Sequence, residues 1–168
     1  NASGHTIGSC FGDVNNDGHI DLIVINFAHP PALQDRTMVC INSGPPDHTF
    51  TNINAGDKAG IHWQESYAKG ALGDFDNDGF VDIFLGGSVF RNLNGNGWET
   101  AANVPGNGLW GDYDNDGDPD LYVSNIGPNR LYRNEGDGSF VDVAHDVGVI
   151  DPFRRSFATW FFDYDNDG

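Results

Sequence analysis

Short apolar runs separated by clusters of Asp, Asn and Gly recur along this chain. Three runs rich in β-branched or aromatic residues follow an Asp-rich segment, at 20–25, 81–85 and 121–123. Short runs bounded by turn residues are typical of β-strands rather than helices. Other short apolar pieces come just before the Asp-rich segments, at 10–11, 71–72, 109–110 and 160–162. The pattern therefore predicts that each Asp-rich segment joins two strands.

Two more strands are predicted in each unit. The third strand covers 38–42, 89–92 and 131–134, and the fourth covers 50–53, 98–100 and 140–143. Four antiparallel strands, repeated at intervals of about 40–60 residues, are typical of the blades of a β-propeller. We therefore predict an all-β fold, a β-propeller fragment of three blades plus the first strand of a fourth. The predicted blades cover about 6–60, 66–104, 106–150 and 157–168.

The last Asp-rich segment stops at Gly168, whereas its earlier copies continue for several residues. Because propellers close with four to eight blades, the simplest expectation is that these residues are part of a longer protein. The alternative is that a second chain completes the ring or stack. The first residues do not resemble a signal peptide, so we expect a mature protein or a piece of one.

The Asp-rich segments share one spacing, with oxygen donors at positions 1, 3 and 5, Gly at position 6 and, in the three copies that extend that far, an acid at position 9. The donors at positions 1, 3 and 5 are Asp13, Asn15 and Asp17; Asp74, Asp76 and Asp78; Asp112, Asp114 and Asp116; and Asp163, Asp165 and Asp167. Position 7 would offer the backbone carbonyl of His19, Phe80 or Asp118, and position 9 the side chain of Asp21, Asp82 or Asp120. Calcium takes six to eight oxygen ligands, which a loop of this kind can supply.

Carboxylates packed this closely repel one another unless a cation lies among them. A solvated turn rich in Asp and Asn would explain one such loop, but not four at matching spacing. We therefore predict Ca²⁺ as the cofactor and expect it to contribute to folding. An EF-hand is excluded, because its position 12 needs Glu, and the residues found there are Val24, Leu85 and Val123.

The chain is strongly acidic, with 8 Lys and Arg against 25 Asp and Glu and a formal net charge of -17. This charge argues against nucleic acid or an anionic membrane surface as a partner. No run approaches the roughly 20 apolar residues of a membrane span. Cys10 and Cys40 could form one disulfide or remain as buried thiols. Asn1 begins an Asn-Ala-Ser triplet, the pattern of an N-glycosylation site.

The loops, read as Asp-x-Asp/Asn-x-Asp-Gly-x-x-Asp between two strands, resemble the FG-GAP and VCBS repeats of integrin α-subunit propellers and many secreted proteins. The stretch 129–140, with Asp142-Val143 and Gly148-Val149, resembles in particular the branch of cartilage acidic protein and ASPIC/UnbV. The resemblance implies calcium-ligand roles for the loop positions given above. Asn15 stands where the pattern has an acid, which would weaken the first site. The Gly-Ala-Pro element of the family name is not evident.

Three functions remain open at this point. The first is an extracellular, secreted structural or adhesive module that binds a protein or matrix partner, for which millimolar extracellular calcium is suitable. The second is a carbohydrate-binding propeller, for which Trp63 is the residue to test for ligand contact. The third is a part of a polysaccharide-processing enzyme, although no constellation of His, Lys or Tyr outside the repeat marks a catalytic site. We therefore expect no catalytic residues, and a protein, matrix or glycan ligand of unknown identity. Assembly with further blades or other chains is also expected.

Overall fold

The computed structural model describes residues 5–27, 37–55, 58–62, 69–125, 127–150, 161–162 and 164–165. These residues contain three four-stranded antiparallel sheets, each formed by consecutive strands. The first sheet comprises β1 (His5–Gly12), β2 (Asp21–Phe27), β3 (Met38–Asn42) and β4 (Phe50–Asn52). The second comprises β5 (Gly70–Gly73), β6 (Asp82–Leu85), β7 (Ser88–Asn92) and β8 (Trp98–Asn103). The third comprises β9 (Asn107–Gly111), β10 (Asp120–Ser124), β11 (Arg130–Asn134) and β12 (Phe140–Asp142).

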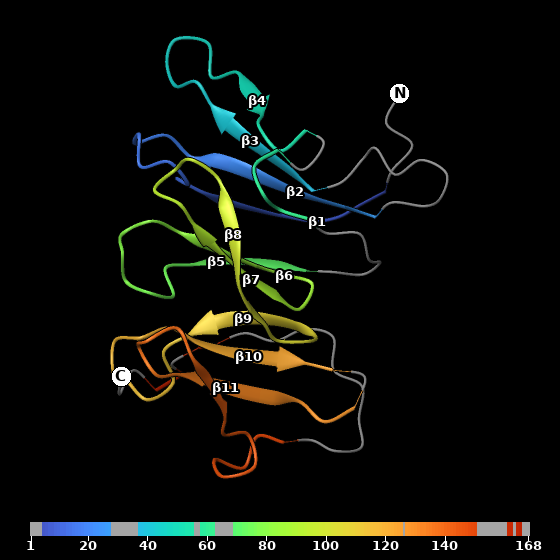
Figure 1. Cartoon of the computed structure of the whole chain (residues 1–168), viewed down its shortest axis with the longest axis vertical. Helices are drawn as coiled ribbons and strands as arrows, with labels where there is room; N and C mark the ends of the chain where they lie inside the picture. The colour runs from blue at the N-terminus through green and yellow to red at the C-terminus, as the bar shows by residue number, and fades with distance from the viewer. Residues whose placement is uncertain are drawn as a thin grey trace.

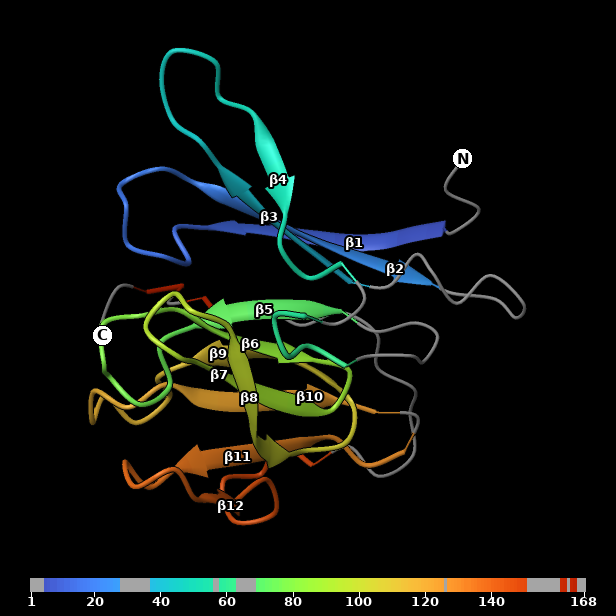
Figure 2. The same cartoon turned by 45° about the horizontal axis from the view of Figure 1, so that its top comes forward.

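The three sheets are stacked along the long axis of the molecule, as in neighbouring propeller blades (Figures 1 and 2). The first strands of successive sheets are neighbours, with β5 in contact with both β1 and β9. The prediction of an all-β, propeller-like fragment is therefore confirmed. Of the predicted strand of a fourth blade at 160–162, residue 160 lies outside the described residues, whereas residues 161 and 162 are described and belong to no strand. No helix in the described part of the chain is long and apolar enough to cross a membrane.

Apolar side chains fill the two spaces between successive sheets. Ile23, Ile25 and Val39 of the first sheet pack with Ile83 and Leu85 of the second. Strand β6, an inner strand of the middle sheet, is buried along its whole length, because this sheet has a neighbouring sheet on each face. This explains why its sequence reads as a continuous apolar run after Asp82, without the alternation of a half-exposed strand.

Glycine ends the first strand of each sheet, and in the first two sheets a large side chain of the next sheet packs against it. A Cβ atom on Gly73 would lie 2.6 Å from Cδ1 of Trp110, and one on Gly12 would lie 2.7 Å from Cδ1 of Leu72. Trp110 stacks on Phe75, with ring centroids 6.1 Å apart, so its ring has little room to move away. The glycine thus permits the close approach of adjacent blades.

Replacing Gly73 with Ala is expected to lower the free energy of unfolding by about 1–3 kcal/mol, because the added methyl group overpacks the joint with Trp110. Gly8→Ala is the matched control in β1, because a Cβ atom there would meet only Cδ1 of Ile25 at 3.7 Å, an ordinary contact. Urea unfolding of both variants measures the difference. Equal stability of the two variants would contradict this account of blade packing.

The two cysteines are free thiols in the structure, so the disulfide considered from sequence is not formed. Cys10 lies on β1 opposite Ile23, whereas Cys40 lies on β3 opposite Leu22, so β2 runs between them. Two strand spacings separate their Cα atoms by roughly 9–10 Å, beyond the reach of a disulfide. Burial raises the pKa of the Cys10 thiol to about 11, as expected for an inert core residue.

Candidate metal centre

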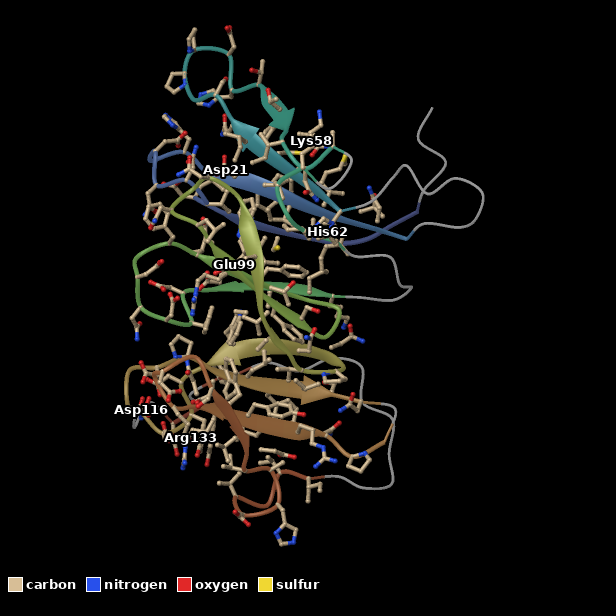
Figure 3. The ribbon with its side chains drawn as sticks, in the orientation of Figure 1. Asp21, Lys58, His62, Glu99, Asp116 and Arg133 are labelled. Carbon is tan, nitrogen blue, oxygen red and sulfur yellow. The ribbon has the colours of Figure 1, made fainter. Side chains whose placement is uncertain are left out.

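Three Asp-rich loops follow one side of the stack, at 13–20, 74–81 and 112–119. Each connects the first two strands of its sheet: β1 to β2, β5 to β6, and β9 to β10. All three loops appear on the left of the molecule in Figure 1, and Asp116 marks this side in Figure 3. The blade packing therefore aligns three acidic loops along one edge.

Each loop is folded by the same hydrogen bonds. In the second loop, Asp74 accepts the backbone N–H of Asp78 at 3.0 Å and that of Gly79 at 2.9 Å. Asp78 in turn accepts the N–H of Phe80 at 2.8 Å. The same three bonds recur at the equivalent positions of the first and third loops. The Gly at position 6 has a positive φ of 85° to 94° in the three loops, which explains why no other residue stands there.

Two of these loops bring three carboxylates together. Asp74, Asp76 and Asp78 each offer an oxygen within 4.8 Å of the others, and so do Asp112, Asp114 and Asp116. The two clusters are the predicted positions 1, 3 and 5. Three carboxylate oxygens this close together could hold a hard cation such as calcium.

The first loop has further contacts besides the shared hydrogen bonds, because the amide of Asn15 replaces one carboxylate. Asn15 donates its Nδ2–H to Asp17 at 3.0 Å, and the Nδ1 atom of His19 lies 3.0 Å from another Asp17 oxygen. These contacts lower the pKa of Asp17, with the Asn15 bond as the largest cause. The first loop therefore has fewer charges to offer a cation than its two neighbours.

An arginine approaches the second cluster. Nε of Arg91 lies 2.7 Å from Oδ2 of Asp76 as an ion pair, and the guanidinium lies 5.4 Å from the ring centroid of Phe75. The other oxygen of Asp76, Oδ1, is buried and has no hydrogen-bond partner. A buried carboxylate oxygen without a partner is costly, and a bound cation would satisfy it. The residues present therefore fit a metal ion.

The third cluster lacks this arginine contact. Arg133 occupies the position in β11 that Arg91 has in β7, but it pairs with Glu135 at 2.7 Å instead. Asp112, Asp114 and Asp116 are all exposed to solvent. The second and third loops are nearly identical in sequence, but they differ in whether an arginine pairs with the carboxylate cluster. The difference arises from the turn after β11, where Glu135 pairs with the arginine, and not from the loop itself.

The acids at position 9 do not join these clusters. Asp82 is fully buried, and its two oxygens accept the backbone N–H of Phe75 at 3.0 Å and of Asn92 at 2.7 Å. Burial raises its pKa to about 7, and the charges of Asp76 and Asp78 add to the effect. Asp82, predicted as a metal ligand, therefore has a structural role, because its hydrogen bonds connect the loop to the third strand. Each carboxylate oxygen keeps a second lone pair, so a ligand role is compatible with this bracing.

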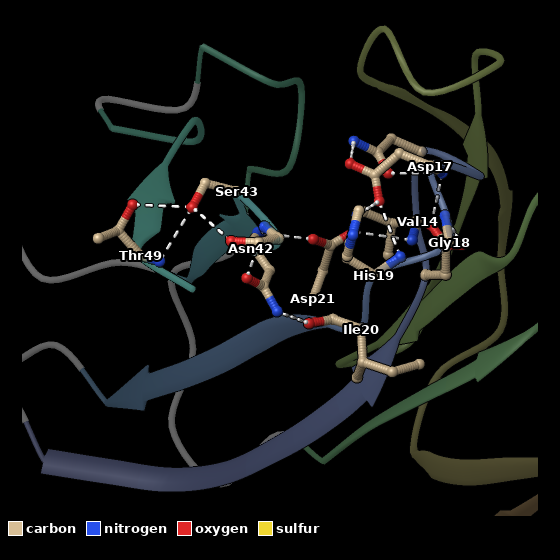
Figure 4. Close-up of polar contacts among 12 residues, drawn as sticks. Val14, Asp17, Gly18, His19, Ile20, Asp21, Asn42, Ser43 and Thr49 are labelled. Carbon is tan, nitrogen blue, oxygen red and sulfur yellow. Dashed lines mark hydrogen bonds and ion pairs between the residues drawn. The ribbon is translucent and has the colours of Figure 1, made fainter. Parts of the chain in front are cut away.

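Asp21 and Asp120 repeat the arrangement. Asp21 accepts the N–H of Val14 at 3.0 Å and of Asn42 at 2.8 Å, as the close-up in Figure 4 shows. Asp120 accepts the N–H of Tyr113 and of Asn134, both at 2.9 Å. Burial raises the pKa of both carboxyl groups.

Sequence reasoning missed the role of the Asn that ends each third strand. Asn92 donates its Nδ2–H to Val81 O at 3.0 Å in its own blade, and to Val14 O at 2.8 Å in the loop of the preceding blade. Asn134 likewise donates to Pro119 O at 3.2 Å and to Phe75 O at 2.6 Å. The repetition of Asn at this strand end was visible in the sequence, but its partners became evident only once the blades were stacked.

The remaining predicted positions are only partly described. At position 7, Phe80 is half-buried and the Asp118 side chain accepts an N–H of Asn77 at 2.7 Å. Asp165 is exposed, whereas Asp163, Asp167 and the predicted glycosylation site Asn1 lie outside the described residues.

Two stretches of the chain, residues 13–85 and 112–168, match the model of the FG-GAP-like repeat. The chain belongs to the FG-GAP-like repeat family. Cartilage acidic protein 1 is similar to this FG-GAP chain over 42 residues, with 45% identity for the Homo sapiens protein and 43% for that of Xenopus tropicalis. These residues are 25% of this chain and 6% of either relative, so the chain spans a small part of their length. The resemblance seen in the sequence is thereby confirmed.

A solved structure shows the same fold. It is described as the structural basis of specific recognition of non-reducing terminal N-acetylglucosamine by an Agrocybe aegerita lectin, and it aligns with a TM-score of 0.52 at 19% identity. The alignment covers 79% of this FG-GAP chain and 37% of the lectin chain. At this identity the likeness concerns the arrangement of the blades alone.

Proposed function

We propose that this FG-GAP chain is a calcium-binding structural module of an extracellular protein. Its metal loops would stiffen one edge of the stacked blades, so that the blades display a binding surface for a protein or matrix partner. The observation that carries this proposal is the clustering of three carboxylates in each of two loops, within 4.8 Å, on a hydrogen-bonded framework that recurs from blade to blade. A role in binding rather than catalysis is part of the proposal.

The positions proposed to hold the ion differ in their task. In the third loop, Asp112 already braces two backbone N–H groups, whereas Asp114 accepts no hydrogen bond that shapes the loop. Asp114 and Asp116 would therefore contribute charge and ligand oxygens, while Asp112 also sets the loop conformation. In the first loop Asn15 supplies a neutral oxygen in place of a carboxylate, so we expect that site to bind more weakly.

Calcium titration by isothermal calorimetry tests the proposal. We expect Asp114→Asn to weaken the third site at least about tenfold, because a ligand charge is lost while the loop framework remains. Asp146→Asn is the control, since Asp146 is 82% exposed and belongs to the turn after β12, outside the loops. Absence of calcium binding to the unaltered chain at millimolar concentration would refute the proposal, as would identical titrations of the two variants.

Carbohydrate binding is the second candidate function. It is supported by the blade arrangement shared with a lectin, which covers 79% of this chain. A glycan array, probed with and without calcium, separates it from a purely structural role. Trp63, the residue that the sequence suggested for ligand contact, lies outside the described residues.

A further inference from the structure

Neighbouring loops of different blades are joined directly by an asparagine at position 4. Asn16 of the first loop donates its Nδ2–H to Gly79 O of the second loop at 2.8 Å. Asn77 of the second loop donates to Gly117 O of the third loop at 3.2 Å and to Oδ1 of Asp118 at 2.7 Å. The direction is the same in both pairs, from the preceding blade to the following one. Position 4 had no assigned role in the calcium-loop pattern.

The backbone at position 4 is adapted to this reach. Asn16 and Asn77 have φ values of 57° and 56°, in the left-handed region that few residues other than Gly and Asn adopt. Gly could also adopt this backbone conformation, but it has no side chain that could reach the next loop. Asn is therefore the residue that both accepts the conformation and carries an amide to the next loop.

The position 4 asparagine donates to a peptide group that also hydrogen-bonds to a carboxylate of the neighbouring cluster. Gly117 O accepts from Asn77, while the N–H of the same peptide, that of Asp118, donates to Oδ1 of Asp116 at 2.9 Å. The equivalent peptide in the second loop is held in the same way, by Asn16 on its carbonyl and by Asp78 on its N–H. An asparagine of one blade thus orients the peptide that positions the fifth-position carboxylate of the next blade.

We propose that Asn77 is a positioning residue for the third metal loop, and Asn16 for the second, so that adjacent sites bind calcium cooperatively. This inference rests on the proposed function. Asn77 lies between Asp76 and Asp78, so an ion in the second loop restricts Asn77 and with it the Gly117–Asp118 peptide. The third loop then loses less conformational freedom when its own ion binds. The coupling is reciprocal by thermodynamic necessity.

The test is a double-mutant cycle read at the third loop. Tyr113 lies within that loop and can sensitise bound terbium, and Tyr164→Phe removes the tyrosine of the fourth loop from the signal. In this background the second loop is disabled by Asp76→Asn with Asp78→Asn, and the link is removed by Asn77→Gly, which keeps the left-handed backbone. Asn94→Gly is the matched control, because Asn94 has a φ of 54° in the β7–β8 turn.

Disabling the second loop is expected to weaken terbium binding at the third loop about threefold to tenfold, within the usual range of coupling between sites. Asn77→Gly should weaken it by a similar factor, and the combination by no more than either change alone. Asn94→Gly should leave it unchanged. Full additivity of the two changes, or an effect of Asn94→Gly as large as that of Asn77→Gly, would overturn the inference. Failure of every protein in the cycle to bind terbium or calcium would instead refute the proposed function.

Discussion

Chelation of calcium is expected to lower the melting temperature of this chain by about 15–30 °C relative to 10 mM calcium. For a dissociation constant of about 0.1 mM, in the range of extracellular modules, this concentration stabilises the fold by roughly 2.7 kcal/mol per site. Three loops together would contribute up to about 8 kcal/mol, with the weaker first loop adding less than the other two. For a chain of this size each kcal/mol shifts the melting temperature by about 2–4 °C. Differential scanning calorimetry with EDTA and with calcium measures the shift.

The size of this effect follows from the charges that the fold brings together. The third loop alone places five Asp carboxyl groups within nine residues, and its neighbouring arginine, Arg133, pairs with Glu135. Without a cation these carboxylates repel one another in the folded chain more than in the unfolded one, where they can separate. Magnesium at the same concentration is the control, since it favours a smaller, octahedral site and should stabilise less. Equal melting temperatures in EDTA and calcium would show that the loops do not bind the ion.

The repeat itself was accessible from sequence because its signals are local. The Asp, Asn and Gly spacing defines a turn, and the apolar runs on either side define strands, so the twelve strands lie close to their predicted positions. The disulfide alternative could not be decided in this way. It depends on whether Cys10 and Cys40 lie on adjacent strands, and the register places β2 between them.

The different roles of the acidic residues within each loop could not be predicted, because these roles depend on contacts between blades. Sequence spacing treated Asp82 as equivalent to Asp76, yet one is a buried brace and the other pairs with Arg91. The close packing of Gly73 against Trp110 likewise joins residues of different blades. Position 4 and the third-strand Asn repeat in the sequence at fixed places, so a search for conserved-looking polar positions within the repeat could have indicated them, but not their partners.

Asn92→Asp is expected to lower the free energy of unfolding by about 3–5 kcal/mol, the cost of an uncompensated buried charge. Asn92 is 1% exposed and donates to two carbonyl oxygens, of Val14 and Val81. Aspartate keeps the shape of the side chain and the acceptor for the Gly95 N–H, which lies 2.8 Å away. It would turn a charged oxygen toward both carbonyls, next to the buried carboxylate of Asp82. Urea unfolding in saturating calcium measures the loss.

The repeat supplies its own control for this substitution. Asn42 occupies the same place in the first blade, donates to Ile20 O at 3.0 Å, and is half-buried (Figure 4). Asn42→Asp therefore disturbs one carbonyl contact within its own blade, and we expect a loss of about 1–2 kcal/mol. Because both variants lose the contact within the blade, the difference between them isolates burial and the bond to the preceding loop. If the two variants were equally stable, the blades would be held together by apolar packing alone, and the polar link between each blade and the preceding metal loop would add nothing to the fold.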